Sequence, residues 1–284
     1  MKIISTIKKM QEIAEDLRKN GKTIAVVPTM GYLHAGHLSL VEIVKHRADI
    51  IIMTIFVNPA QFGPNEDFTK YPRDIERDTK SAEAAGADYL FIPAMEEMYP
   101  KDYFTYVNVE ELTTVLEGKF RPTHFKGVAT VVAKLLNITQ PHVAVFGQKD
   151  AQQAVVIRRM VKDLNFPVEI VIAPIIREDD GLAMSSRNVY LSPVERDESV
   201  VLNRSLKHAE TMIKAGERRS DAIIKEMQSM ILGARSAVID YIAITDPQTL
   251  HEIPHIQSKG SVLISMAVRI GKTRLIDNIL INIS

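Results

Sequence analysis

The sequence from Pro28 to His37 reads Pro-Thr-Met-Gly-Tyr-Leu-His-Ala-Gly-His. It follows an apolar run at residues 23–27, which predicts a buried strand, and it precedes residues 38–46, where apolar side chains recur with helical spacing. The stretch is therefore a strand-to-helix turn. A helix N-terminus carries N–H groups and partial positive charge, and Gly31 and Gly36 let a ligand approach the backbone. The turn predicts an anion site.

Two histidines, His34 and His37, stand three residues apart at the start of the expected helix. This spacing places both imidazoles on one face, where they can donate to the same phosphate chain. In the alternative interpretation one histidine packs and the other is solvated. A zinc pair is a further alternative, but it needs a third ligand, and the chain has no cysteine to supply one.

Strands and helices alternate on both sides of this turn. The patterns predict strands at residues 23–27, 49–57, 89–92, 142–146 and 168–176, and helices at 5–19, 38–46, 74–85, 130–138 and 150–164. Such alternation predicts an α/β fold with a Rossmann-like parallel sheet, helices on both faces, and a ligand crevice at the carboxyl ends of the strands. Residues 95–125 are less regular and are expected to form an insertion or an edge of the site.

The pattern changes beyond about residue 178. Two long helical patterns, at residues 193–215 and 220–232, precede strands expected at 238–244, 261–268 and 274–281. We therefore expect a nucleotide-binding domain at residues 1–177 and a smaller C-terminal α+β lid domain at residues 178–284.

The composition of the chain limits the kinds of molecule that it is expected to bind. The chain has 284 residues, with 35 Lys and Arg against 35 Asp and Glu, so no net charge favours nucleic acid or an anionic membrane. No segment is long and apolar enough to cross a bilayer, and the first residues do not resemble a secretion signal. These features predict a cytoplasmic protein that acts on small molecules, without nucleic acid or membrane partners.

Two further loops carry candidate ligand-binding residues. Gly147 permits close approach to a ribose, Asp150 can accept from its hydroxyl, and Lys149 can meet a phosphate. Alternatively, Asp150 only caps a helix and Lys149 is a solvated surface residue. The second loop holds Ser185, Ser186 and Arg187, which suit a polyphosphate, or else form a serine-rich linker.

Two glutamines are candidate ligands for an uncharged part of a substrate. Gln61 and Gln153 can hydrogen-bond a polyol or hydroxy acid, although either could be an ordinary surface or helix residue. The turn at residues 121–125 could supply cations for a carboxylate, but a surface turn is the preferred interpretation. Since no covalent nucleophile is evident, the expected chemistry is direct attack on the α-phosphate of ATP.

Several motifs, taken in order, resemble those of the pantothenate synthetase family, the pantoate:β-alanine ligases. The motifs lie at residues 28–37, 56–62, 71–73, 121–128, 146–153 and 184–188, and the length and tail pattern also fit. The resemblance implies that (R)-pantoate attacks MgATP to give pantoyl adenylate and pyrophosphate, and that β-alanine then displaces AMP. It also implies a fold like that of class I aminoacyl-tRNA synthetases, and a homodimer.

The resemblance also implies roles for individual residues. His34 and His37 would bind the phosphates, with His37 as proton donor, and Lys149 and Arg187 would be the other catalytic residues. The remaining ATP-binding residues would be Met30, Gly31, Gly36, Gly147, Asp150, Ile176, Met184, Ser185 and Ser186. Gln61, Gln153 and Asn58 would bind pantoate and β-alanine.

One departure concerns the serine loop, a relative of the Lys-Met-Ser-Lys-Ser loop of the synthetases. Ala183 and Ser186 stand where that loop has lysines, so the phosphate charge must be met by Lys149 and Arg187. Magnesium is expected to arrive with ATP, and the candidates to touch it are Asp67, Asp74 and Asp78. The alternatives are a nucleotidyltransferase of the same superfamily and a noncatalytic nucleotide-binding module. A tRNA synthetase is disfavoured because the C-terminal region lacks a basic excess.

Overall fold

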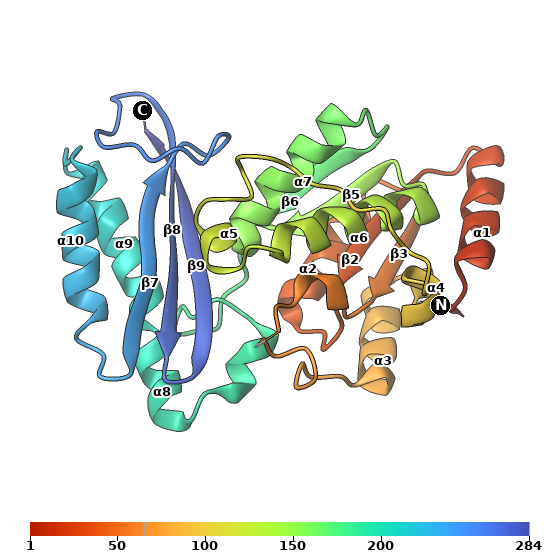
Figure 1. Cartoon of the computed structure of the whole chain (residues 1–284), viewed down its shortest axis with the longest axis horizontal. Helices are drawn as coiled ribbons and strands as arrows, with labels where there is room; N and C mark the ends of the chain where they lie inside the picture. Colours follow the sequence, from red (N-terminus) through yellow and green to blue (C-terminus); the bar gives the residue numbers. More distant parts are fainter. Residues whose placement is uncertain (65, 284) are drawn as a thin grey trace. The chain divides into compact units, whose positions relative to one another are not determined.

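The computed structural model describes residues 1–64 and 66–283. Its internal contacts divide the chain into two compact units (Figure 1). The N-terminal unit comprises residues 1–114, 118–147 and 156–174, and the C-terminal unit comprises residues 115–117, 148–155 and 175–284. Within the described ranges, no helix combines the length and apolar character needed to cross a bilayer.

The N-terminal unit is built on a parallel sheet of six strands in the order β1-β4-β3-β2-β5-β6. The strands are β1 (Lys2–Ile4), β2 (Ile24–Thr29), β3 (Ile50–Ile55), β4 (Tyr89–Phe91), β5 (Val143–Gly147) and β6 (Glu169–Ala173). The predicted parallel sheet is thus confirmed. The short edge strand β1 was not expected from the sequence, because three residues show too little periodicity; it pairs with β4 from Lys2 opposite Tyr89.

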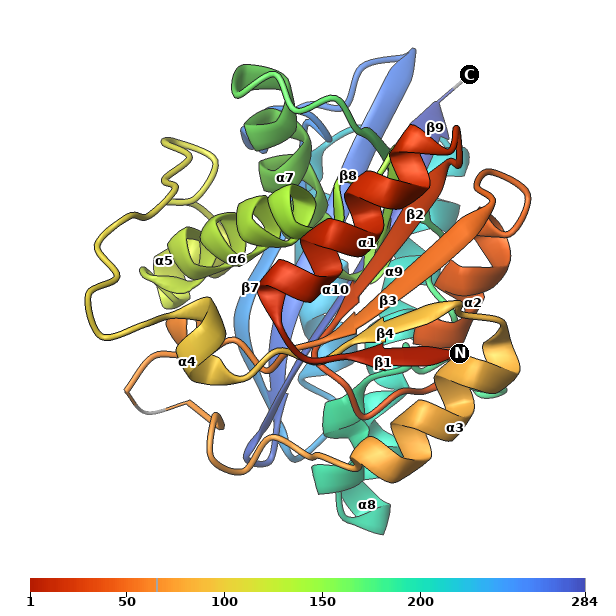
Figure 2. The ribbon, with the colours of Figure 1, turned by 90° about the vertical axis from the view of Figure 1, so that its right-hand side faces the viewer.

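Helices cover both faces of this sheet. Ile24 and Val26 of β2 belong to one apolar cluster, whereas Ala25 and Val27 belong to another, as alternation along a strand requires. The first cluster packs under α1 (Ile7–Lys19), α6 (His124–Thr139) and the second half of α7 (Ala151–Asp163), and the second packs under α2 (Ala35–Val44) and α3 (Ile75–Ala85). Figure 2 shows α1 and α6 across the first face.

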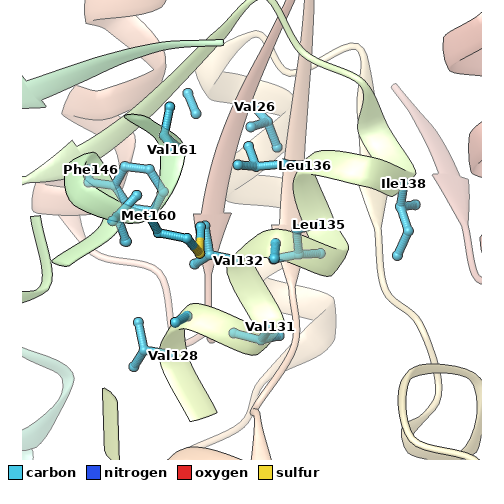
Figure 3. Close-up of a cluster of buried hydrophobic side chains, with 14 of the residues drawn as sticks. Val26, Val128, Val131, Val132, Leu135, Leu136, Ile138, Phe146, Met160 and Val161 are labelled. Atoms are coloured by element: carbon cyan, nitrogen blue, oxygen red, sulfur yellow. The ribbon is translucent and has the colours of Figure 1, made fainter. Parts of the chain in front are cut away.

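The longest helix of the unit, α6, carries much of the first cluster. Val128, Val132 and Leu136 belong to the same cluster as Val26 and Phe146, and Leu136 lies beside Val26 (Figure 3). The helix begins at His124, six residues before the predicted start at 130.

A glycine at the start of α6 explains how closely this helix approaches a neighbouring segment, η1 (Pro59–Gln61). A Cβ on Gly127 would lie 2.2 Å from the carbonyl oxygen of Ala60, so only glycine fits this contact. Further short helices are α4 (Met95–Met98) and α5 (Glu117–Phe120), and two 3-10 helices, η2 (Gln148–Asp150) and η3 (Ser186–Tyr190), lie further along the chain.

The C-terminal unit contains an antiparallel sheet of three strands, β7 (Ala237–Thr245), β8 (Gly260–Ile270) and β9 (Thr273–Ile283). Its apolar cluster also takes side chains from α9 (Val201–Lys214) and α10 (Ser220–Ile231), which confirms the predicted α+β composition.

The single helix expected at residues 193–215 is instead two helices, α8 (Pro193–Ser199) and α9, which join at Val200. The hydroxyl of Ser199 donates to the carbonyl of Arg196 at 2.6 Å. Such a side-chain bond competes with helical pairing of the backbone.

Candidate active site

The histidine turn lies between β2 and α2. The structure starts α2 at Ala35, three residues earlier than the pattern predicted, because His34 caps the helix. The Nδ1 atom of His34 accepts from the N–H of Gly36 at 3.1 Å, and the Nδ1 atom of His37 accepts from the N–H of His34 at 3.4 Å. The ring centroids are 4.0 Å apart, so the spacing-based prediction that the two imidazoles share a face is confirmed.

These two bonds determine which ring nitrogen can act as a donor. Because both Nδ1 atoms accept backbone N–H groups, a neutral imidazole at either position carries its proton on Nε2. The reciprocal pattern of His34 and His37 is that of a capping box. The turn therefore holds two adjacent Nε2–H donors, a set suited to phosphate oxygens.

A buried aspartate on α3 holds the turn in shape. Asp78 is fully buried, and its two oxygens accept from the N–H of Tyr32 at 2.6 Å and of Leu33 at 2.7 Å. Gly31 has φ +83°, and a Cβ there would lie 3.0 Å from an Asp78 oxygen, so glycine is required beside this carboxylate.

Arg77, the residue before Asp78 on α3, contacts the same turn through a ring and a backbone carbonyl. The guanidinium of Arg77 lies over the ring of Tyr32, 4.4 Å from the centroid, and donates to the carbonyl of Leu33 at 2.5 Å. Asp74 caps α3 by accepting from the N–H of Arg77 at 3.1 Å. Two of the three aspartates considered for magnesium, Asp74 and Asp78, are thus engaged with backbone N–H groups.

A second group of site residues surrounds η1. The Nδ2 atom of Asn58 donates to the Oε1 atom of Gln61 at 3.1 Å, and the Nε2 atom of Gln61 lies 3.0 Å from the sulfur of Met30. Met30 belongs to the histidine turn. The structure therefore brings Gln61, a candidate residue for binding the acid substrate, into contact with Met30, a candidate residue for binding ATP.

The turn at residues 121–125 lies behind Gln61. His124 Nδ1 lies 2.9 Å and an Arg121 nitrogen 3.3 Å from the main-chain oxygen of Gln61. Arg121 also makes a two-fold bond to Glu66, at 2.7 and 2.6 Å. Burial acts to raise the pKa of Glu66, but hydrogen bonding and charge from Arg121 outweigh it and lower that pKa. The turn is thus not an isolated surface turn, because it supports Gln61.

Within the C-terminal unit, β9 holds the loop that carries Lys149. The Nδ2 atom of Asn278 donates to the carbonyls of Gln148 at 3.0 Å and Lys149 at 2.9 Å, and its Oδ1 atom accepts from Gln148 Nε2 at 3.0 Å. Lys149 is half-buried and Asp150 is exposed immediately before α7.

Two adjacent glutamines at the start of α7 differ in their surroundings. Gln152 is buried and binds the main chain of residues 115–117, accepting from the N–H of Glu117 at 2.9 Å and donating to the carbonyl of Val115 at 2.8 Å. Gln153, the residue predicted to bind substrate, is half-buried. The pair thus contains one glutamine tied to the main chain and one with part of its surface accessible to a ligand.

The structure also brings together Ile176 and Met184, two of the residues that the resemblance assigns to ATP binding. The N–H of Met184 donates to the carbonyl of Ile176 at 3.0 Å, which aligns the two residues across a short antiparallel turn. Ser185 follows, and its hydroxyl accepts from the N–H of Arg187 at 3.2 Å, while Ser186 is buried. The serine loop therefore leads into a short 3-10 helix, η3 (Ser186–Tyr190), which Ser185 caps.

Comparison with known proteins decides the family. The family model for pantoate-beta-alanine ligase matches residues 2–280. The chain belongs to the pantoate-beta-alanine ligase family. Among curated relatives of this family, pantothenate synthetase from Acetivibrio thermocellus is 55% identical over 283 residues and that from Caldicellulosiruptor bescii 56% over 281, with at least 99% of each chain covered.

Solved structures of pantoate-beta-alanine ligases support the same family. The crystal structure of pantothenate synthetase from Thermus thermophilus matches with a TM-score of 0.92 and 44% identity, covering 98% of this chain and 99% of that one. The ligase from Francisella tularensis, complexed with beta-gamma ATP and beta-alanine, matches with a TM-score of 0.80 and 34% identity over 99% and 97% of the two chains. The predicted family, fold and ligase class are confirmed.

The sequence interpretation did not identify three residues that support the site: Arg77, Tyr99 and Asn278. Asp78 was considered only as a magnesium candidate, although a charged residue on the buried face of an amphipathic helix is a usable signal of a structural role, since burial of an unpaired carboxylate is costly. For Asn278, a polar residue within an apolar strand pattern could have served as a similar signal.

Proposed function

We propose that this ligase joins (R)-pantoate to β-alanine in two steps through a pantoyl adenylate. A carboxylate oxygen of pantoate attacks the α-phosphorus of ATP, and the bond from that phosphorus to the bridging oxygen breaks, releasing pyrophosphate. The amine of β-alanine then attacks the acyl carbon, AMP leaves, and the amine loses a proton.

The observation that carries the proposal is the contact between Gln61 and Met30 at 3.0 Å in the N-terminal unit. It brings an amide suited to a hydroxy acid beside the turn that holds the two Nε2–H donors of His34 and His37. An acid activated by ATP must meet the nucleotide's α-phosphate, so these two groups have to be neighbours.

Each remaining residue takes a role that its chemistry suits. We assign the Nε2–H donors of His34 and His37 to oxygens of the phosphate chain, where they stabilise charge as pyrophosphate departs, with His37 as proton donor. Lys149 and Arg187 neutralise phosphate charge, and Gln61 and Gln153 hold pantoate. The other residues assigned to ATP are Met30, Gly31, Gly36, Gly147, Asp150, Ile176, Met184, Ser185 and Ser186.

Magnesium is proposed to enter bound to ATP, as part of the substrate. The carboxylates of Asp74 and Asp78 accept backbone N–H groups of the protein, so neither is assigned to the ion. Chelation with EDTA should abolish turnover, and an excess of Mg²⁺ should restore it.

The deciding experiment is pyrophosphate release from MgATP, first with pantoate alone and then with β-alanine added. Stoichiometric release with pantoate, which becomes catalytic and yields AMP and pantothenate with β-alanine, is the expected result. Pantoate-independent release would favour a different acceptor, as in a nucleotidyltransferase. ATP binding without any release would overturn the ligase proposal and favour a noncatalytic nucleotide-binding module.

A further inference from the structure

A fully satisfied amide lies directly behind Gln61. Asn58 is 1% exposed, and its Nδ2 atom donates to the carbonyl of Gly127 and to Gln61 Oε1, both at 3.1 Å. Its Oδ1 atom accepts from the hydroxyl of Tyr99 at 2.9 Å and from the N–H of Ala60 at 3.3 Å. A primary amide has two N–H groups and two lone pairs, so all four positions of Asn58 are used by the protein.

These hydrogen bonds determine which end of the Gln61 amide faces Met30. Because Oε1 accepts from Asn58, the Nε2 atom is the end of the amide that faces Met30. A thioether sulfur is only a weak acceptor, so a ligand oxygen can replace it with a gain in hydrogen bonding. His124 and Arg121 meanwhile hold the main-chain oxygen of Gln61. Gln61 is thus presented as a donor.

The shorter of the two bonds to Asn58 Oδ1 comes from Tyr99, whose ring is itself held in place. Its centroid is 6.1 Å from that of Phe56 and 5.0 Å from that of Tyr103, which meets it edge-on. The ammonium of Lys134 lies over the ring of Tyr103 at 4.7 Å. Burial, and to a lesser degree Tyr103, raises the pKa of Tyr99 far above its ordinary value, so the phenol remains a donor.

We propose that Tyr99 is a positioning residue for the acid substrate: its hydroxyl orients Asn58, which orients Gln61 so that Nε2–H meets an oxygen of pantoate. This inference rests on the proposed function, because it takes Gln61 to bind pantoate. It reassigns Asn58 from substrate contact to support of Gln61. Tyr99 touches no substrate in this scheme and acts through two amides.

The test combines Tyr99→Phe with Gln61→Ala in a double-mutant cycle. Tyr99→Phe keeps the ring and removes the hydroxyl, so we expect the KM for pantoate to rise about three- to tenfold, the size of one weakened hydrogen bond, with the KM for ATP unchanged. In the Gln61→Ala background the same change should have no further effect on the KM for pantoate, because the residue through which Tyr99 acts is absent.

Tyr103→Phe is the matched control, since this tyrosine belongs to the same aromatic stack, and it should leave both KM values unchanged. Equal rises in both KM values with Tyr99→Phe, or the same rise with and without Gln61, would show a general structural effect and overturn the inference. The proposed function has a separate outcome. If Gln61→Ala alone leaves the KM for pantoate unchanged, then Gln61 does not bind pantoate, and this part of the proposed function is wrong whatever the result with Tyr99→Phe.

Discussion

At the scale of single residues, the two histidines that cap the start of α2 are also the residues to which the proposed chemistry assigns the phosphate chain. His34 and His37 each use Nδ1 to accept a backbone N–H, and this leaves Nε2–H as the donor on both rings. Serine or asparagine, the usual capping residues, would close the helix start equally well, but neither can take up and release a proton near neutral pH as an imidazole can. The two histidines therefore accept backbone N–H groups at the helix start and also provide the Nε2–H donors that the proposed chemistry requires.

His37→Ala is expected to lower the rate of pantoyl adenylate formation by about 100- to 1,000-fold, since removal of one transition-state donor typically has that effect. Single-turnover quench-flow with MgATP and pantoate measures it, and circular dichroism checks the fold. His46→Ala, which changes an exposed histidine just after α2, is the control. A near-normal rate in His37→Ala would remove this residue from the mechanism.

His142 should make folding sensitive to acid. Burial, and then the charge of Arg18, lower its pKa below the ordinary 6.5, and its Nδ1 atom accepts from the N–H of Ile24 at 3.0 Å. The unfolded chain therefore binds more protons as pH falls through about 6.5, so this residue's contribution to stability is lost on acidification.

In His142→Asn the side-chain oxygen can replace Nδ1 as acceptor without titrating. Urea unfolding between pH 7.5 and pH 5.5 should show a smaller loss of stability in this variant than in the parent protein. Identical pH slopes in the two proteins would exclude the assigned effect.

At the scale of elements, α3 acts as the clamp of the histidine turn. Asp78→Asn replaces one of the two carboxylate acceptors with a donor, so the N–H groups of Tyr32 and Leu33 have one acceptor fewer. We expect adenylation to slow by about tenfold to 100-fold, because a small displacement of positioned groups is enough for such a loss. Quench-flow gives the rate, and imidazole ¹⁵N NMR should show a loss of the uniform Nε2–H form at His34 and His37.

Asp74→Asn is the control on the same helix, since asparagine is also a good N-cap. It should retain the parent rate. If Asp78→Asn keeps both the parent rate and the parent NMR pattern, α3 has no positioning role.

The strand β9 is expected to support nucleotide binding through Asn278. Asn278→Ala removes the donor to the carbonyls of Gln148 and Lys149, so the loop should lose order and the KM for ATP should rise several-fold, with less change for pantoate. Asn282→Ala, on the same strand and bonded to Ser261 at an exposed position, is the control. Steady-state kinetics with each substrate varied separately distinguishes the two variants, and equal effects from both would contradict this role.

At the scale of the whole molecule, the family resemblance predicts a homodimer. The chain mass is 31.8 kDa, so sedimentation equilibrium should give twice that value at micromolar concentration. A single species at the chain mass over the same range would contradict the prediction.

Much of the fold is predictable from local patterns. Apolar runs such as residues 49–57 form central strands because both faces of a parallel sheet are covered, and alternation with helical periods then implies the topology. Element ends were less predictable. The helix α6 starts six residues before its predicted start, and its first turn packs Gly127 against Ala60, a contact between segments far apart in the sequence.

The sequence by itself determined the family, the α/β class and the loops that carry the proposed chemistry, because these depend on residue order and local periodicity. Only the tertiary structure decided that Asp78 clamps the histidine turn, that Tyr99 and Asn58 orient Gln61, and that Asn278 holds the loop of Lys149. The physical reason is that buried polar groups must be paired, and their partners come from distant segments that no local pattern records.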